Sequence, residues 1–293
     1  MRSDKRLLII IVAVLAAVGI WASALLPSGK TLDVTVMDVG EGLCVVMRTP
    51  SDKVMVMDCG TGSWRKSDTV GESVVVPYLH RMGKNAIDVA VLSHPHSDHV
   101  SGYAGLLKAV PAKVVMDIGA KHASPFYKRF LRQVKMSGAT YRIAKRGQKI
   151  EMGDGVTVQV LSPDPEMHYS DLNNNSIVLR IVYKKAAILL AADAEEEAEQ
   201  DILDSGMSVR AQVLQVGHHG SKAASSAQWL AAVKPAIAII SCGRHNNYGH
   251  PSSQAIDRLE SCGARVYRTD RCGAVTIATD GSVIQAKTCA SIR

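Results

Sequence analysis

The stretch VLSHPHSDHVSG, residues 91–102, decides how this chain is interpreted. It places His94, His96, Asp98 and His99 close together, directly after the apolar run at residues 88–92. An apolar run that ends in polar residues is typical of a buried strand followed by a loop. Neutral imidazole and carboxylate are the ligands that zinc and similar divalent ions prefer. The stretch therefore predicts a metal-binding loop at a strand end, in preference to a surface loop that is merely rich in histidine.

The composition allows one large core or two small ones, with few aromatic side chains. Of 293 residues, 47% are apolar but only 4% are aromatic, so aliphatic residues and methionine must fill the core. The formal net charge is +7, which favours an anionic partner without identifying it. The six cysteines include no C-x-x-C pair, so we expect free, buried thiols and assign no disulfide.

The first residues form a separate segment. An uncharged, apolar run at residues 7–26 follows three basic residues and is long enough to span a bilayer, which takes about 20 residues. The basic flank predicts that the following chain lies outside the cytoplasm. We expect residues 1–28 to be a transmembrane anchor or a signal peptide, with the anchor favoured, and residues 29–293 to form the exported domain.

Polar residues follow several other apolar, strand-like runs. Asp58 follows residues 54–57, Asp193 follows the hairpin at 177–190, and the pair His218–His219 follows 213–216. A polar stretch at residues 242–251 follows the run at 236–241. In layered α/β proteins such strand ends meet at one edge of the sheets. We assign the three glutamates at 195–197 to the first turn of a helix, because negative charge is favoured there.

Residues 124–137 are predicted to form a helix between Ser124 and Gly138. Its charged face carries Lys128, Arg129, Arg132 and Lys135. Between residues 118 and 150 the chain has nine basic residues and no acidic one. Such a face either is simply solvated or binds a polyanion, and the missing counter-charge gives the two interpretations equal weight.

The motifs resemble those of the metallo-β-lactamase superfamily. Its H-x-H-x-D-H loop matches residues 94–99, its later aspartate matches Asp193, and its last histidine matches one of His218 and His219. The stretches SHPHSDHVSG, NNNSIVLR, AADAEEEAEQ, VGHHGS and NNYGHP resemble, in that order, the hydrolase domains of ComEC-like competence proteins. The resemblance covers residues 32–288. It implies an α/β fold, a four-layer αββα sandwich preceded by one N-terminal hydrophobic helix.

The resemblance also implies one or two divalent metal ions and their ligands. The first ion would lie between His94 and His96, and the second between Asp98, His99 and one histidine of the later pair, with Asp193 shared. We favour His218 over His219 for that place. Asp98 and Asp193 are the expected catalytic residues. The expected ligands are His94, His96, Asp98, His99, Asp193 and His218. Residues expected beside the ions or the substrate are Asp58, Asn173, His219, Asn246, Tyr248 and His250.

The chain departs from the superfamily at one ligand position. A third histidine for the first ion usually precedes the hairpin that ends at Asp193. Here the sequence reads DLNNNS, and Asn173 lies nearest to the expected place. Asparagine is a weaker zinc ligand, so zinc is the first expectation and manganese or magnesium the alternative.

These features predict an extracytoplasmic metallohydrolase that cleaves phosphodiester bonds. The expected substrate is DNA, the attacking group is a hydroxide held by the metal ions, and a separate membrane channel is a further expected partner. Two alternatives are a phosphodiesterase of cell-envelope polymers, such as phosphocholine-bearing teichoic acid, and a catalytically idle DNA-binding module that docks on a channel. A true β-lactamase ranks last, because the basic face at residues 128–135 would have no role in binding a small neutral drug.

Overall fold

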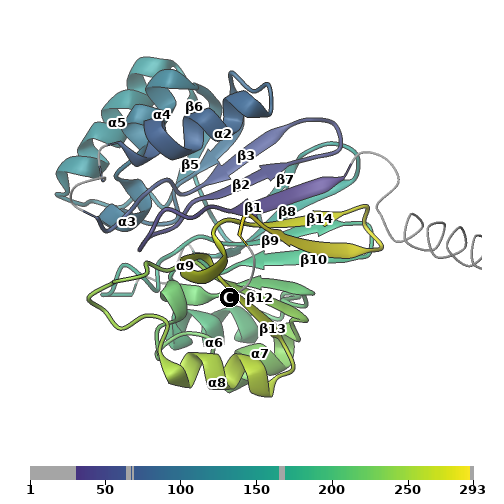
Figure 1. Ribbon diagram of the computed structural model, residues 1–293. Helices are drawn as coiled ribbons and strands as arrows, with labels where there is room; N and C mark the ends of the chain where they lie inside the picture. Colours follow the sequence, from purple (N-terminus) through teal and green to yellow (C-terminus); the bar gives the residue numbers. More distant parts are fainter. Residues whose placement is uncertain (1–30, 64–66, 68, 165–168, 291–293) are drawn as a thin grey trace, which may run out of the picture.

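The computed structural model describes residues 31–63, 67, 69–164 and 169–290. Two mixed β-sheets stack face to face, and helices cover the outer face of each (Figure 1). The expected αββα sandwich is thus confirmed. In the described part of the chain no helix is long and apolar enough to cross a membrane. The run at residues 7–26, on which the expected anchor or signal peptide depends, lies outside the described residues.

The first sheet has eight strands, four of which run parallel to one another. In spatial order they are β15 (Ile284–Thr288), β14 (Val275–Thr279), β1 (Leu32–Val36), β2 (Val45–Arg48), β3 (Val54–Met57), β4 (Ile87–Val91), β5 (Ala112–Asp117) and β6 (Thr140–Ile143). Strands β3 to β6 are the parallel set, and each ends at the same edge of the sheet. The metal loop follows β4, as its apolar sequence predicts.

The second sheet has seven strands and a similar plan. In spatial order they are β13 (Arg265–Arg268), β12 (Ile237–Ile240), β11 (Val213–Gln215), β10 (Ala186–Leu190), β9 (Val178–Tyr183), β8 (Val156–Ser162) and β7 (Lys149–Glu151). Strands β9 and β10 form the predicted antiparallel hairpin, whereas β10 to β13 are parallel. The polar stretches after β10, β11 and β12 therefore leave one edge together.

Helices cover the two outer faces (Figure 1). Beside the first sheet lie the π-helical turn η1 (Gly71–Val75), α2 (Val76–Arg81), α3 (Ser97–Val100), α4 (Tyr103–Ala109) and α5 (Pro125–Ser137). The remaining helical elements are α6 (Glu196–Asp204), the 3-10 turn η2 (Gly217–Gly220), α7 (Ala227–Val233), α8 (Ser253–Ser261) and α9 (Thr269–Cys272). Helix α5 has the predicted bounds, and Gly138 ends it in the left-handed conformation at φ 69°.

The core has three parts. One cluster, which includes Met47, Met57 and Ile188, fills the space between the sheets. It consists mainly of aliphatic residues and methionine, as the composition predicts, together with Tyr183 and Tyr267. Two others, around Phe130 and around Trp229, lie under the helices of each outer layer. All six cysteines are free thiols, and four are buried as expected, whereas Cys262 and Cys289 are exposed. The two stacked sheets bring their loop-bearing edges together, and we call this shared rim the carboxyl edge.

Candidate metal centre

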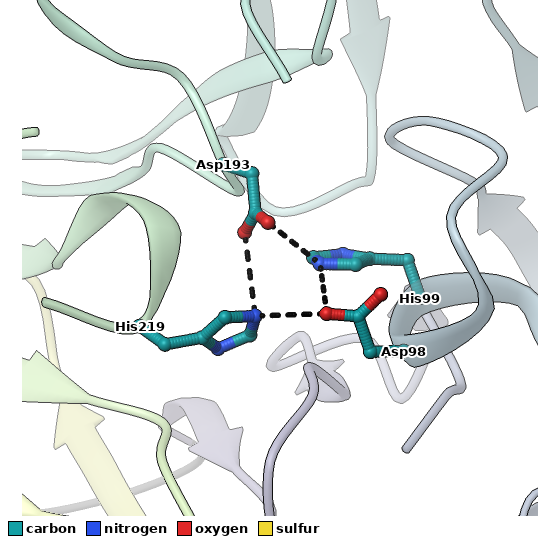
Figure 2. Close-up of side chains that lie close together, drawn as sticks. All are labelled: Asp98, His99, Asp193 and His219. Atoms are coloured by element: carbon teal, nitrogen blue, oxygen red, sulfur yellow. Dashed lines mark hydrogen bonds and ion pairs between the residues drawn. The ribbon is translucent and has the colours of Figure 1, made fainter. Parts of the chain in front are cut away.

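Four side chains from three separate loops meet at the carboxyl edge (Figure 2). They are Asp98 and His99 of α3, Asp193 just after β10, and His219 of η2. One potential ligand atom from each lies within 4.8 Å of all the others. Three of the four side chains are buried, and Asp98 is partly exposed. The two sheets therefore build one compact group of imidazole and carboxylate ligands.

The Nε2 atoms of both histidines face the two carboxylates (Figure 2). His99 Nε2 lies 3.1 Å from Asp193 Oδ2 and 3.7 Å from Asp98 Oδ2. His219 Nε2 lies 3.3 Å from Asp98 Oδ2 and 3.7 Å from Asp193 Oδ1. Asp193 thus contacts both histidines, in keeping with the central position that we expected for it.

The other ring nitrogen, Nδ1, of both His99 and His219 is engaged in a hydrogen bond. His99 Nδ1 lies 2.8 Å from Oδ2 of Asp58, which also accepts a hydrogen bond from the Ser93 hydroxyl. His219 Nδ1 donates to the Ser241 carbonyl at 2.9 Å. A ring nitrogen that donates outward leaves the other free to bind a metal ion. Asp58 therefore lies where the sequence placed it and orients His99.

Buried atoms of the group lack hydrogen-bond partners among the described residues. They include His99 Nε2 and Asp193 Oδ1, although charged atoms lie close to both. Buried polar groups are rarely left unpaired in native proteins. A divalent ion between these atoms would satisfy both, and a mixed His and Asp ligand set suits zinc or manganese. The residues present fit a metal ion.

The electrostatics of the group also favour a cation. Burial opposes charge on His99, but Asp193, Asp58 and Asp98 outweigh that effect and raise its pKa well above the usual value. Burial opposes charge on Asp98 and Asp193 as well, yet the neighbouring His99 and His219 hold both pKa values below the usual range. Against burial, Asp193 and Asp98 raise the pKa of His219 to about 9. Several carboxylates thus act on one buried volume and attract positive charge.

Backbone strain collects at the same place. Asp58, Ala192, His218 and His219 adopt φ angles of 60°, 48°, 45° and 53°. Residues with a side chain seldom adopt this left-handed conformation, and such strain clusters at functional sites. Directly before the two histidines, position 217 requires a glycine. The backbone passes so close to Ala194 that a Cβ at this position would lie 2.6 Å from the Ala194 carbonyl oxygen.

The expected order of the histidine pair is reversed. His219, not His218, joins Asp98, His99 and Asp193. His218 turns its Nδ1 to Glu195 at 2.6 Å, and its Nε2 lies 3.9 Å from Asp193. Successive residues point in different directions, and only the backbone of η2 decides which one faces the sheet interface.

The remaining expected metal ligands lie beside this group. His94 Nε2 is 3.0 Å from His96 Nδ1 and 4.0 Å from Asp193 Oδ2. The hydroxyls of Ser93 and Ser176 lie 3.1 and 3.2 Å from His94 Nδ1. Asn173 has a buried Oδ1 with no partner among the described residues, and its Nδ2 lies 3.5 Å from His218 Nε2. His94 thus lies beside both His96 and Asp193, whereas Asn173 lies beside His218. Among the described residues, the group that could hold a metal ion is the one formed by Asp98, His99, Asp193 and His219.

A cavity of about 320 Å³ opens over the cluster. It is lined by Glu41, His96, Ser97, Asp98, Asn173, Asp193, His218, His219, Tyr248 and His250. Asn246 is not among these residues, because its amide bonds to the Gly243 and His250 carbonyls and holds the loop. We expected Asn246 to contact the substrate, but in the structure its amide supports that loop.

Two glutamates of the site were not predicted from the sequence. Glu41, 9% exposed, accepts a hydrogen bond from Gly243 N at 2.7 Å, and its other oxygen lies 3.2 Å from His250 Nδ1. Glu195 lies one position before α6 and pairs with His218, so it is not solely part of the helix start. The G-E-G turn at residues 40–42 was the available signal for Glu41, because an acidic residue between glycines follows a strand there.

Comparison with known proteins agrees with this geometry. The family model of the metallo-beta-lactamase superfamily matches residues 37–244. The chain belongs to this superfamily. The chain is 30% identical to ComE operon protein 3 of Bacillus subtilis (strain 168), over 83% of this chain and 32% of the relative. It is 33% identical to competence protein ComA of Neisseria gonorrhoeae, over 83% of this chain and 31% of the relative. The chain thus spans about a third of the length of these curated relatives.

A solved structure shows the same fold. The metallo-beta-lactamase fold protein YhfI from Bacillus subtilis matches 85% of this chain and all of its own length, with a TM-score of 0.55 and 13% identity. The expected family is confirmed, and it supports the prediction of a metal-dependent hydrolase.

In this metallo-β-lactamase-fold chain, the four basic residues of α5 lie on its exposed side. Lys128, Arg129, Arg132 and Lys135 are all exposed, whereas Tyr127, Phe130 and Val134 are buried. Arg129 and Arg132 line a groove toward α4 together with Lys108 and Glu72. The predicted basic face of α5 therefore lies partly in that groove, through Arg129 and Arg132, and partly on the open side of the helix.

Proposed function

We propose that this protein is a metal-dependent phosphodiesterase whose polymeric substrate is DNA. The observation that carries the proposal is the convergence of His99, His219, Asp98 and Asp193 on one buried volume beneath an open cavity. Such a site can hold a metal ion and still admit a substrate group from one side.

The residues that would hold the ions are those of the four-residue cluster and, beside them, His94 and His96. Divalent ions at such a site polarise a phosphoryl oxygen and lower the pKa of a water molecule, so that it becomes a nucleophile at neutral pH. Zinc is the first expectation, and the oxygen-rich neighbourhood of Asp193 and Asn173 leaves room for manganese.

The side chains around the cavity would position the substrate. Asp58 keeps His99 Nε2 aimed at the cluster, and Asp98 and Asp193 provide carboxylates that can accept and orient the proton of an attacking water. His250, held by Glu41, also lines the cavity and stacks with Tyr248 at a centroid distance of 5.8 Å. Tyr248 is 72% exposed, so its ring is available to a base of a bound strand.

DNA is the favoured polymer for two reasons. The curated relatives include a protein of the ComE operon and a competence protein, and their similarity covers most of this chain. In addition, the chain carries a net charge of +7 and exposes basic residues on α5. Positive charge of this kind binds phosphate backbones through release of counterions.

A second candidate is a DNA-binding module without catalytic activity. Asn173 favours it, because it stands where the superfamily resemblance leads one to expect a histidine, and asparagine is a weak zinc ligand. The two candidates differ in metal content and turnover, which can be measured on one preparation.

The test uses the full 293-residue chain beside Asp193→Asn, His96→Ala and the control Asp204→Asn, an exposed carboxylate at the end of α6. Bound metal is measured together with hydrolysis of bis-p-nitrophenyl phosphate and of fluorescent single-stranded DNA, in zinc and in manganese. The proposal expects turnover in the wild type and the control, with loss in both site variants. Metal below one equivalent without turnover in either ion would contradict it and favour the idle module.

Export, and a tether through residues 7–26, remain predictions from the sequence. We propose that the domain acts outside the cytoplasm and that DNA reaches it beside a separate membrane channel. Protease added to intact cells would digest the domain if this placement is right and would spare it otherwise.

A further inference from the structure

We propose that strand β6 and the loops that follow β5 and β6 form a binding surface for single-stranded DNA, with Tyr141 as a platform for one base. The proposal takes its substrate class from the proposed phosphodiesterase and therefore rests on it. It adds residues that lie outside the metal centre and its cavity.

The surface begins at the metal centre. Strands β4, β5 and β6 are parallel neighbours, so the loops that follow them leave the carboxyl edge side by side. The loop after β4 is the metal loop, and the loop after β5 contains Lys121 and His122. The His122 ring lies 6.4 Å from the His96 ring, between centroids. A strand bound at the metal centre can therefore continue over these loops.

Tyr141 presents an anchored aromatic ring. Strand β6 is the last strand of its sheet, and all four of its side chains are exposed. Tyr141 is 40% exposed as a residue, while its hydroxyl donates to the buried carboxylate of Asp117. Asp117 also accepts from the Tyr127 hydroxyl at 2.8 Å and from Gly119 N at 2.6 Å. The hydrogen bond thus fixes one end of the Tyr141 side chain. A base that stacks on its exposed face therefore restricts the side chain little further, and the loss of conformational entropy is small.

The cations on this surface lack acidic partners. Lys121, Arg142 and Lys145 are exposed, and none forms an ion pair within the part of the chain that the structure describes. Arg146, in the same loop as Lys145, differs, since it pairs with Asp164 and Asp201 across to the second sheet. Charges without acidic partners match the phosphates of a flexible strand, and the exposed ring of Tyr141 matches one of its bases.

The ring decides between single strands and duplexes. A base must leave its neighbours before it can stack on Tyr141, and a single strand does this at little cost. A duplex keeps its bases paired and offers this surface only its backbone. The competing use of an open edge strand, pairing with another polypeptide, needs the backbone of β6 and not the Tyr141 ring.

The experiment measures binding rather than turnover. The metal-supplemented full chain is titrated into a fluorescein-labelled phosphorothioate oligothymidine and, separately, a hairpin duplex, and anisotropy is recorded. Tyr141→Leu is expected to weaken oligothymidine binding about fivefold to a hundredfold, as loss of one stacked base does. Tyr141→Phe keeps the ring but loses its anchor on Asp117, so its loss of affinity should be smaller than that of Tyr141→Leu. Lys121→Gln and Lys145→Gln should each lower the slope of log affinity against log salt by about 0.7.

Lys53→Gln is the matched control. Lys53 is exposed and directly precedes β3, so it lies at the amino ends of the parallel strands, away from the carboxyl edge. Unchanged affinity in Tyr141→Leu, an equal loss for the hairpin duplex, or an equal loss in Lys53→Gln would each overturn the proposal. Hydrolysis of bis-p-nitrophenyl phosphate by the wild type is measured in parallel. Absence of hydrolysis would contradict the proposed phosphodiesterase activity. The binding measurements test the DNA-binding surface independently of that activity.

Discussion

Oδ2 of Asp58 lies 2.8 Å from Nδ1 of His99, and both side chains are fully buried. The contact joins the end of β3 to the helix that follows β4, across two parallel strands of one sheet. Because the Asp58 carboxylate accepts a hydrogen bond from Nδ1 of His99, Nε2 is the ring nitrogen that is turned toward Asp193, and it is the atom that would bind a metal ion. One hydrogen bond thus orients the ring of an expected metal ligand.

Replacing Asp58 with Asn should weaken metal binding about tenfold to a hundredfold, the usual effect of losing such an outer partner. The amide offers an N–H to the Nδ1 position and no longer stabilises the imidazole in the required form. Metal affinity is measured by competition with a chromophoric chelator. Asp204→Asn, on the surface of α6, is the control and should bind as the wild type does. Equal affinity in Asp58→Asn would show that His99 does not depend on Asp58.

The two adjacent histidines should behave differently. His219→Ala removes an Nε2 atom that lies 3.3 Å from Asp98 and 3.7 Å from Asp193, so at least one equivalent of metal should be lost. His218→Ala removes a partner of Glu195, so metal content should fall less, while substrate binding in the cavity weakens. Cobalt substitution followed by visible absorption reports the ligand change directly. The reverse ranking would restore His218 as the ligand.

A methyl group at Gly60 should displace the metal loop. A Cβ there would lie 2.3 Å from the Asp98 carbonyl carbon and 2.4 Å from His99 N, and backbone atoms cannot move away individually. Gly60→Ala should therefore lose metal and destabilise the fold by about 1–3 kcal/mol, as overpacking does. In Gly62→Ala, two residues further on, the nearest atom would be at 3.4 Å, and we expect much smaller changes. Chemical denaturation and metal analysis of both variants check this.

Glu199 should make stability depend on pH. Its buried carboxylate accepts hydrogen bonds from Ser225 N and Ser226 N, but burial outweighs them and raises its pKa. The folded state thus holds this proton more tightly than the unfolded state does. The resulting stabilisation is complete below the unfolded glutamate pKa of about 4.3 and is lost as the pH rises through the folded value.

Glu199→Gln removes that titration, at the expense of about 1–3 kcal/mol for an imperfectly paired buried N–H. The free energy of unfolding of the wild type minus that of the variant should therefore decrease as the pH rises from 4 toward neutrality. Urea denaturation at several pH values measures the difference. A difference that increases with pH would mean that the pKa of Glu199 is lowered in the fold.

Much of the fold follows from neighbours along the chain. Helix α5 begins at Pro125 and ends before Gly138 because the proline, glycine and periodicity signals are local, although the Ser124 side chain makes no cap hydrogen bond. The strand–loop sequence at residues 88–99 likewise predicts four polar residues at one strand end, and Asp58 and Asp193 were expected at the same edge on similar grounds.

Other parts of the site depend on how the two sheets stack. Whether His218 or His219 faces Asp98 depends on the left-handed backbone of η2, and no composition rule distinguishes two adjacent histidines. Glu41 reaches Gly243 and His250 from the other sheet, and Arg146 is neutralised by Asp164 and Asp201, although its sequence neighbourhood contains only basic charge. Local sequence determines where a strand ends and which residue types are presented there. Only the packing of one sheet on the other decides which of those side chains meet, because contact between residues far apart in sequence is a property of the whole core.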